Sequence, residues 1–201
     1  MMLIMFVIKS KNFLDMNKGF NQIFSTPIFT SIVNSKVVKY MEELIIPRLN
    51  SLEHYTEYST DFFQKEKITN FKELLPFFTS IDNTIDEYSK FSNLKRSKKV
   101  QYWVQDYKKN QLFPSHAHGN KYISGVYYIK ANENAGSLRF FNANPICRIE
   151  NILDEKNESN IFVDIKPEKG LLVLFPSWLL HEVLPGNKEE CIRTCLAFNL
   201  I

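Results

Sequence analysis

The chain has 201 residues, of which 44% are hydrophobic and 23% charged, and its formal net charge is +3. This size and composition are those of a single globular domain with a sizeable core, and the charge excess is too small to indicate nucleic-acid binding. The cysteines are odd in number and lack metal-type spacing, which predicts free thiols in a reducing, cytoplasmic compartment: Cys147, Cys191 and Cys195.

The N-terminal segment MMLIMFVIKSKNFLDM begins with an apolar run that is too short to span a bilayer. It also lacks the basic start and small-residue cleavage site of a signal peptide, and no other segment predicts a transmembrane helix. It is either a short added strand or an upstream extension with the true start at Met16. We expect residues 1–21 to be a dispensable extension and residues 22–201 to form one domain.

The first half of the chain predicts a strand and two helices. Residues 22–33 have strand character interrupted by Pro27, as at a sheet edge or a bend. Residues 34–49 place apolar side chains at helical spacing, and Pro47 is predicted to end this helix. In the second helix, over 70–91, Asn70 is a favourable N-cap and apolar residues recur every three or four positions. Both apolar faces are expected to be core.

From about residue 100 the apolar period changes to two, which is typical of strands. Six segments rich in β-branched and aromatic residues are separated by turn residues: VQYWVQDY, YISGVYYI, GSLRFFN, IFVDI, GLLVLFP and IRTCLAFNL. Helices followed by a run of strands predict an α+β fold, with the N-terminal helices packed on a sandwich or barrel.

The segment HAHGNKYISGVYYI carries two of the four histidines of the chain, His116 and His118, one residue apart. On an extended chain, residues i and i+2 point to the same face, so the two imidazoles can converge on one metal ion. The alternative is a pair of polar residues on an exposed loop. His181, in FPSWLLHEVLPG, follows an apolar strand and is either a third ligand or a strand-end histidine bonded to backbone.

Alternation along the last strand places Arg193, Cys195, Ala197 and Asn199 on one face. A guanidinium on an inward face needs an anion, whereas an Arg at the strand end could pair with Glu182 or Glu189. In the same way Ser124, Val126 and Tyr128 share a face of YISGVYYI and offer hydroxyls to a carboxylate, unless that strand is plain core with tyrosine hydroxyls reaching the surface.

Three ligands on one side of an iron leave three positions open. A 2-oxo acid can take two of them and O₂ the third, while a buried Arg on a late strand binds the far carboxylate.

These pieces together resemble the 2-oxoglutarate- and Fe(II)-dependent dioxygenases, in the branch of small oxygenases found in phages and marine bacteria. The matching motifs run in the family's order over residues 22–201: IFSTPIF, HAHGNKYISGVYYI, GSLRFFN, GLLVLFPSWLLHEVLPG and IRTCLAFN. The resemblance implies a double-stranded β-helix, the cupin-like jelly roll, with helices packed on the sheet. It also implies a dioxygenase that uses Fe(II), 2-oxoglutarate and O₂ to hydroxylate a substrate and releases succinate and CO₂.

The resemblance assigns His116 and His181 as metal ligands and Arg193 as the anchor of 2-oxoglutarate. It places Tyr128 near this cosubstrate and Leu138 along its pocket; we add Ser124 and Asn199 as candidate cosubstrate contacts, because they share the inward faces.

One departure concerns the first motif, where most of the superfamily has Asp or Glu and this chain has His118. An imidazole remains an acceptable iron ligand, but it removes a negative charge and should weaken the retention of Fe(II). We count His118 as the third catalytic ligand.

Two other functions remain open. One is a three-histidine, cupin-type metalloprotein that does not use 2-oxoglutarate, against which Arg193 argues. The other is a non-enzymatic jelly-roll binding module with a relict site. The substrate, a small molecule or a peptide, is not readable from the sequence, and neither is the oligomeric state. The polar stretch 142–160 is the longest candidate for a loop that contacts the substrate.

Overall fold

The computed structural model describes residues 25–51, 69–144, 161–186 and 190–201. The predicted N-terminal extension and most of the polar stretch 142–160 therefore lie outside the described residues. In chain order the elements are β1 (Phe29–Ile32), α1 (Ser35–Asn50), α2 (Phe71–Ser92), β2 (Val100–Tyr107), β3 (Phe113–His116), β4 (Ile123–Ala131), β5 (Leu138–Phe141), β6 (Phe162–Ile165), β7 (Leu171–Pro176), β8 (His181–Val183) and β9 (Arg193–Leu200).

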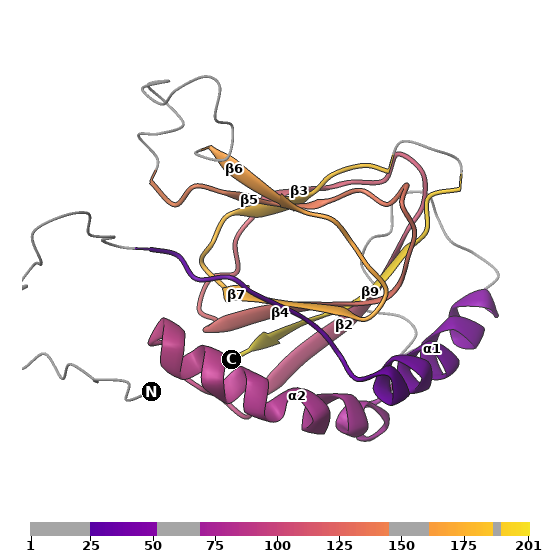
Figure 1. Ribbon diagram of the computed structural model, residues 1–201, viewed down its shortest axis with the longest axis horizontal. Coiled ribbons are helices and arrows are strands. Elements are labelled where there is room, and N and C mark those ends of the chain that lie inside the picture. The colour runs from indigo at the N-terminus through magenta and orange to yellow at the C-terminus, as the bar shows by residue number, and fades with distance from the viewer. Residues whose placement is uncertain (1–24, 52–68, 145–160, 187–189) are drawn as a thin grey trace, which may run out of the picture.

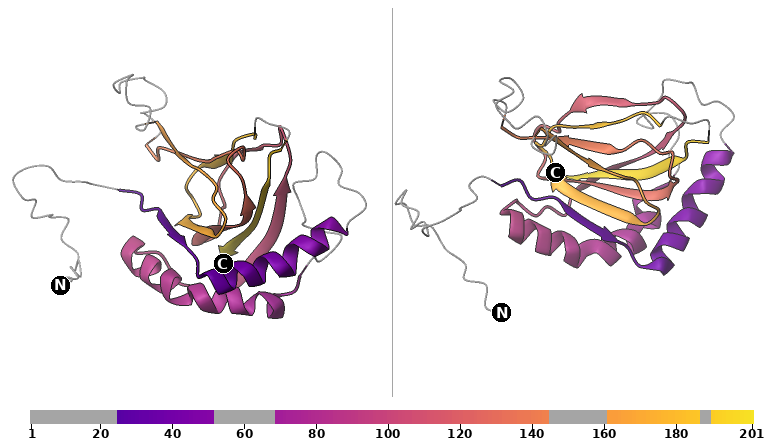
Figure 2. Two further views of the ribbon diagram at one scale, coloured as in Figure 1. Left: turned by 45° about the vertical axis from the view of Figure 1, so that its right-hand side comes forward. Right: turned by 45° about the horizontal axis from the view of Figure 1, so that its top comes forward.

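The strands form two sheets whose strand pairs are all antiparallel. One sheet has the order β1-β7-β4-β9-β2 and the other has the order β3-β8-β5-β6. The two sheets face each other, and both helices cover the outer face of the five-stranded sheet (Figures 1 and 2). This arrangement confirms the predicted α+β class and the jelly roll with helices packed on its sheet.

The period-two pattern of the sequence separates two apolar cores. On β9, Leu196 and Phe198 belong to the core between the five-stranded sheet and the helices. Their neighbours Cys195 and Ala197 belong to the core between the two sheets. The predicted faces of this strand are confirmed, because alternate side chains of a strand point to opposite sides of the sheet.

Helix α2 begins as the sequence predicts. The side chain of Asn70 accepts a hydrogen bond from the backbone N–H of Glu73, and the Glu73 side chain accepts one from the backbone N–H of Asn70. This capping box satisfies two N–H groups that have no partner within the helix. The predicted apolar face is buried at Leu74, Phe78, Ile81, Ile85 and Tyr88, whereas Leu75 is exposed.

The predicted end of α1 at Pro47 is wrong, because the helix continues to Asn50. A proline inside a helix removes one backbone hydrogen bond and costs about 3 kcal/mol or more. Contacts beyond the proline offset that cost. Leu49 is buried in the core, and Arg48 makes a bidentate ion pair with Glu73 of α2. Tertiary contacts therefore override the local stop signal.

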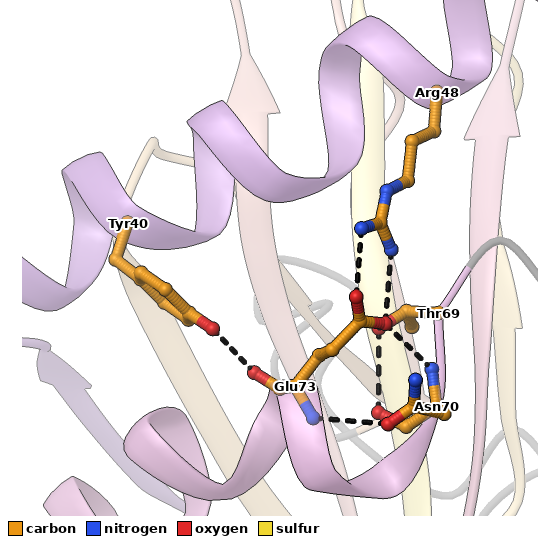
Figure 3. Close-up of polar contacts among 5 residues, drawn as sticks. All are labelled: Tyr40, Arg48, Thr69, Asn70 and Glu73. Atoms are coloured by element: carbon orange, nitrogen blue, oxygen red, sulfur yellow. Dashed lines mark hydrogen bonds and ion pairs between the residues drawn. The ribbon is translucent and has the colours of Figure 1, made fainter.

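Glu73 joins the two helices (Figure 3). Its carboxylate accepts hydrogen bonds from both terminal nitrogens of Arg48, at 3.0 and 2.7 Å, and from the hydroxyl of Thr69 at 3.1 Å. The hydroxyl of Tyr40 donates to the Glu73 carbonyl at 2.7 Å. The Arg48 hydrogen bonds and the backbone N–H of Asn70 lower the pKa of the Glu73 carboxyl to about 2.

The first strand is shorter than predicted, but it lies at a sheet edge as expected. Strand β1 begins at Phe29 and its sheet neighbour is β7. Pro27 lies before the strand, and its carbonyl accepts a hydrogen bond from the hydroxyl of Tyr88 on α2 at 2.9 Å. Within the described ranges, neither helix has the length and apolar character needed to cross a membrane.

Candidate metal centre

Three histidines meet at one end of the space between the sheets. His116 ends β3, His181 begins β8, and the two residues are paired across these strands. His118 follows two residues after His116. One ring nitrogen of each histidine lies within 4.8 Å of the others, and the ring centroids of His116 and His181 are 4.3 Å apart. Residues far apart in the sequence thus form one cluster of potential metal ligands.

Each imidazole is held by its Nδ1 atom. Nδ1 of His116 donates to the carbonyl of Pro114 at 2.9 Å, and Nδ1 of His181 donates to the carbonyl of Leu179 at 2.8 Å. Nδ1 of His118 donates to the side-chain oxygen of Asn199 at 2.7 Å. Because the Nδ1 atoms carry the protons, all three Nε2 atoms carry lone pairs, which is the tautomer that binds a metal.

Two of these lone pairs face each other. Nε2 of His116 and Nε2 of His118 are 3.1 Å apart. Two acceptors at this distance repel each other unless a cation or a proton lies between them. Two metal–nitrogen bonds of about 2.1 Å that meet at a right angle span about 3.0 Å, so the separation fits a shared metal ion.

Burial keeps the cluster neutral. It is the main reason why the pKa of His116 and of His118 lies below the usual value, and it lowers the pKa of His181 to about 3. Imidazole binds a metal through its neutral form, so these pKa values favour metal binding at neutral pH.

His118 reaches the cluster in a way that the sequence did not predict. The prediction placed it on a strand, beside His116 on one face, whereas β3 ends at His116. Instead, the backbone N–H of His118 donates to the carbonyl of Ser177 at 2.8 Å, and Asn199 holds its ring. Contacts with residues distant in the sequence therefore turn His118 inward.

A cavity of about 300 Å³ opens onto the three histidines. Its wall includes a row of inward side chains from β2 that the sequence analysis did not single out, namely Trp103, Gln105 and Tyr107. The signal was present, because in VQYWVQDY these three share one strand face while Val100, Tyr102 and Val104 take the other.

Arg193 is 1% exposed and lies beside two aromatic rings. Its guanidinium carbon is 4.6 Å from the ring centroid of Tyr107 and 5.4 Å from that of Tyr128. Nη2 donates to the Tyr128 hydroxyl at a long 3.4 Å, and Nε and Nη1 have no hydrogen-bond partner among the described residues. A buried cation with two unused donors is a site for an anion.

The alternative partners of Arg193 do not hold it. Glu182 lies near Arg139 instead, with 3.9 Å between Nη1 and Oε1, and Glu189 lies outside the described residues. Nor does Tyr128 reach the surface, because its side chain is fully buried. The structure thus brings Arg193 and Tyr128 together in the core between the sheets, where Leu138 is also buried.

Ser124 and Asn199 lie beside His118, paired across β4 and β9. The Ser124 hydroxyl donates to the side-chain oxygen of Asn199 at 2.7 Å and lies 2.8 Å from the hydroxyl of Ser177. The Asn199 oxygen therefore accepts two hydrogen bonds, one from Ser124 and one from His118. These side chains orient a histidine, and the contact with a cosubstrate that the sequence predicted for them stays a prediction.

Of the three cysteines, Cys191 and Cys195 are free and buried. Cys147 lies outside the described residues.

Residues 101–199 match a family described as "Putative 2OG-Fe(II) oxygenase". This range includes the three histidines, Tyr128 and Arg193. It begins within β2 and ends within β9, so it covers nearly all of the jelly roll and both walls of the cavity. No curated protein sequence matches the chain.

Several solved structures share the fold. A prolyl-4-hydroxylase from Pseudomonas putida aligns with a TM-score of 0.55 and 17% identity over 88% of this chain and 85% of that one. A prolyl hydroxylase from Trichoplax adhaerens, in complex with a hypoxia inducible factor peptide fragment, aligns with a TM-score of 0.57 and 14% identity. The alignment covers 87% of this chain and 82% of that one. HygX from Streptomyces hygroscopicus, with nickel and 2-oxoglutarate bound, aligns with a TM-score of 0.52 and 11% identity over 87% of this chain and 82% of that one. At these identities the likeness establishes the fold, and the phage and marine branch stays a prediction.

Proposed function

Since the chain belongs to the 2-oxoglutarate- and Fe(II)-dependent oxygenases, we propose that His116, His118 and His181 hold its iron and that Arg193 holds 2-oxoglutarate. The observation that carries the metal assignment is the pair of facing lone pairs on His116 and His118, 3.1 Å apart. A cation between them removes their repulsion.

The donor set fits Fe(II). Imidazole nitrogen is a ligand that iron accepts, and three ligands on one side of an octahedral ion leave three positions for a cosubstrate and O₂. When bound, iron supplies the redox chemistry in which O₂ oxidises 2-oxoglutarate to succinate and CO₂ and hydroxylates a C–H bond of the substrate.

Arg193 supplies the recognition of a dicarboxylate. Nε and Nη1 have no partner among the described residues, and Nη2 has a second proton beside the one it donates to Tyr128. The guanidinium can therefore donate a bidentate pair of hydrogen bonds, from Nη2 together with either Nε or Nη1, to the distal carboxylate of 2-oxoglutarate. The hydroxyl of Tyr128 accepts from Nη2, so its own proton remains available for the same carboxylate. Because this end of the site is buried, the ion pair would form away from water, where its electrostatic attraction is stronger.

The walls of the cavity exclude water from the reacting groups. Phe175 is buried, and Phe113 and Trp103 are partly buried beside the three histidines. The ring of Phe113 lies 4.5 Å from that of His116, measured between centroids. Apolar walls of this kind limit the loss of oxidising equivalents to solvent and leave one face of the metal site to a substrate.

The unused donors of Arg193 favour this function over a cupin-type metalloprotein that does not use 2-oxoglutarate. Such a protein would bury a guanidinium without its anion, at a large cost in solvation free energy. A relict site would carry the same cost without a function to maintain it.

The decisive experiment is an anaerobic Fe(II) titration with and without 2-oxoglutarate. We expect a metal-to-ligand charge-transfer band in the visible only when both are present, followed by succinate release on admission of O₂. Fe(II) binding without such a band would favour the cupin-type protein, and the absence of Fe(II) binding would favour the relict site.

A further inference from the structure

Lys121 is a cation in the wall of the cavity that the proposed function does not use. It lies in the segment between His118 and β4, is partly buried, and lines the cavity together with the three histidines. Among the described residues, no carboxylate forms an ion pair with its ammonium group, although most of the other partly buried basic side chains of the fold have one.

The cavity has no acidic side chain to balance this charge. Of the described residues that line it, Lys121 is the one with a full formal charge, and none is Asp or Glu.

The charges of the loaded site leave Lys121 without a counterion. With three neutral imidazoles, a bound Fe(II) and the guanidinium of Arg193 carry three positive charges, of which the dianion of 2-oxoglutarate can balance two. Arg193 is buried beside Tyr107 and Tyr128, where it would take the distal carboxylate. Lys121 instead lines the cavity beside the three histidines, whereas Arg193 is not among the residues that line it. An ammonium partly removed from water is stabilised by an anion there.

We propose that Lys121 binds an anionic group, a carboxylate or a phosphate, of the substrate, and that Trp103, Phe113 and Phe175 hold the adjoining apolar part. The inference rests on the proposed function and adds a substrate class to it: a small molecule or side chain whose negative charge lies next to an apolar portion.

The test compares small aromatic probes of different charge, of which benzoate and benzamide have nearly the same shape. Benzoate and phenyl phosphate carry the anion next to a ring, and benzamide replaces the carboxylate with a neutral amide. The protein is loaded with Ni(II) and 2-oxoglutarate to prevent turnover, and dissociation constants are measured by calorimetry. We expect at least one anionic probe to bind about tenfold more tightly than benzamide, with a preference that falls as salt is added.

Variants assign the preference to one residue. Lys121→Gln should remove the preference for the anionic probe, and Lys121→Arg should keep this preference. Lys72→Gln, on the exposed side of α2, makes the same charge change away from the cavity and should leave the preference intact. A preference that survives in Lys121→Gln, equal binding of charged and neutral probes by the unaltered protein, or no binding of any probe at 10 mM, about the weakest affinity such small ligands show, would each overturn the proposal.

The cosubstrate is the other possible source of the anion. If Lys121→Gln weakened 2-oxoglutarate about tenfold and benzoate competed with 2-oxoglutarate, Lys121 would belong to the cosubstrate site and the substrate assignment would fail. Failure of the proposed function has a different signature. The charge-transfer band would then be missing in the unaltered protein, whatever the probes show.

Discussion

The side-chain oxygen of Asn199 lies 2.7 Å from Nδ1 of His118, and it also accepts a hydrogen bond from the hydroxyl of Ser124 at 2.7 Å. Because both lone pairs of this oxygen are in use, the amide has one orientation and His118 has one tautomer. The buried strand β9 thus fixes the direction of a ring that projects from a segment outside any strand.

Asn199→Ala should weaken metal binding by about 10- to 100-fold, the usual effect of losing the group that orients a ligand histidine. The measurement is a Ni(II) titration by calorimetry. Asn199→Asp keeps an acceptor at the same place and should retain most of the affinity. An unchanged dissociation constant in Asn199→Ala would show that His118 does not depend on this hydrogen bond.

His118→Asp tests the charge of the ligand set. If three imidazoles hold the iron, they leave its charge unbalanced, so Fe(II) should bind loosely alone and about tenfold or more tightly with 2-oxoglutarate. An aspartate restores the commoner triad and should tighten Fe(II) in the absence of 2-oxoglutarate. His118→Ala should lose affinity in both conditions. If neither substitution moves the Fe(II) dissociation constant, His118 is not a ligand.

Arg193→Lys keeps the charge but loses the planar fork of the guanidinium, so we expect the affinity for 2-oxoglutarate to fall at least about tenfold. The affinity should fall further in Arg193→Met, which keeps the bulk of the side chain without its charge. Fe(II) affinity measured without 2-oxoglutarate serves as the control and should stay the same. Equal 2-oxoglutarate affinity in Arg193→Met and the unaltered chain would reject the assignment.

Gly125→Ala should destabilise the fold. A Cβ at this position of β4 would lie 2.1 Å from Cζ of Phe198, whose ring is buried against Phe77 and Phe78 of α2. Overpacking of this kind costs about 1 to 3 kcal/mol, measurable by urea unfolding. Gly119→Ala is the matched control, because no atom lies within 4 Å of its added Cβ. An equal effect of the two substitutions would contradict the steric explanation.

Glu73 should make stability depend on acid pH. Its pKa in the folded chain is about 2, below the ordinary 4.5, because of Arg48 and the N-cap of α2. The stabilisation it contributes is complete above pH 4.5 and is lost as the pH falls toward 2. Melting temperatures between pH 6 and 3 should fall more steeply in the unaltered chain than in Glu73→Gln. Parallel pH profiles would show that this ion pair adds no stability.

Local patterns predict those parts of the fold that depend on local physics. The alternation of apolar and polar residues placed Arg193 and Tyr128 on inward faces, and Asn70 marked the start of α2. The patterns fail where distant contacts decide. Strand β3, with Pro114 within it, has too little apolar character to be recognised, and it is ordered by pairing with β8.

His118 and Pro47 show the same limit. The direction of the His118 ring depends on Asn199 and Ser177, which no pattern around residue 118 reveals. The last turn of α1 depends on Glu73 in another helix. In both cases a side chain distant in the sequence overrides the local preference of the backbone.

The position of β9 in its sheet also sets how the chain folds. This strand is inserted between β4 and β2, and it pairs Leu200 with both Val100 and Ile123. Such pairings close long loops, and the conformational entropy is lost before the contacts that stabilise the sheet have formed. Folding of this topology is therefore slow. Until β9 arrives, β2 and β4 each expose an unpaired edge that a second chain can join. The strand that carries Arg193 and Asn199 is therefore also the one that covers the facing edges of β2 and β4 when it pairs with them.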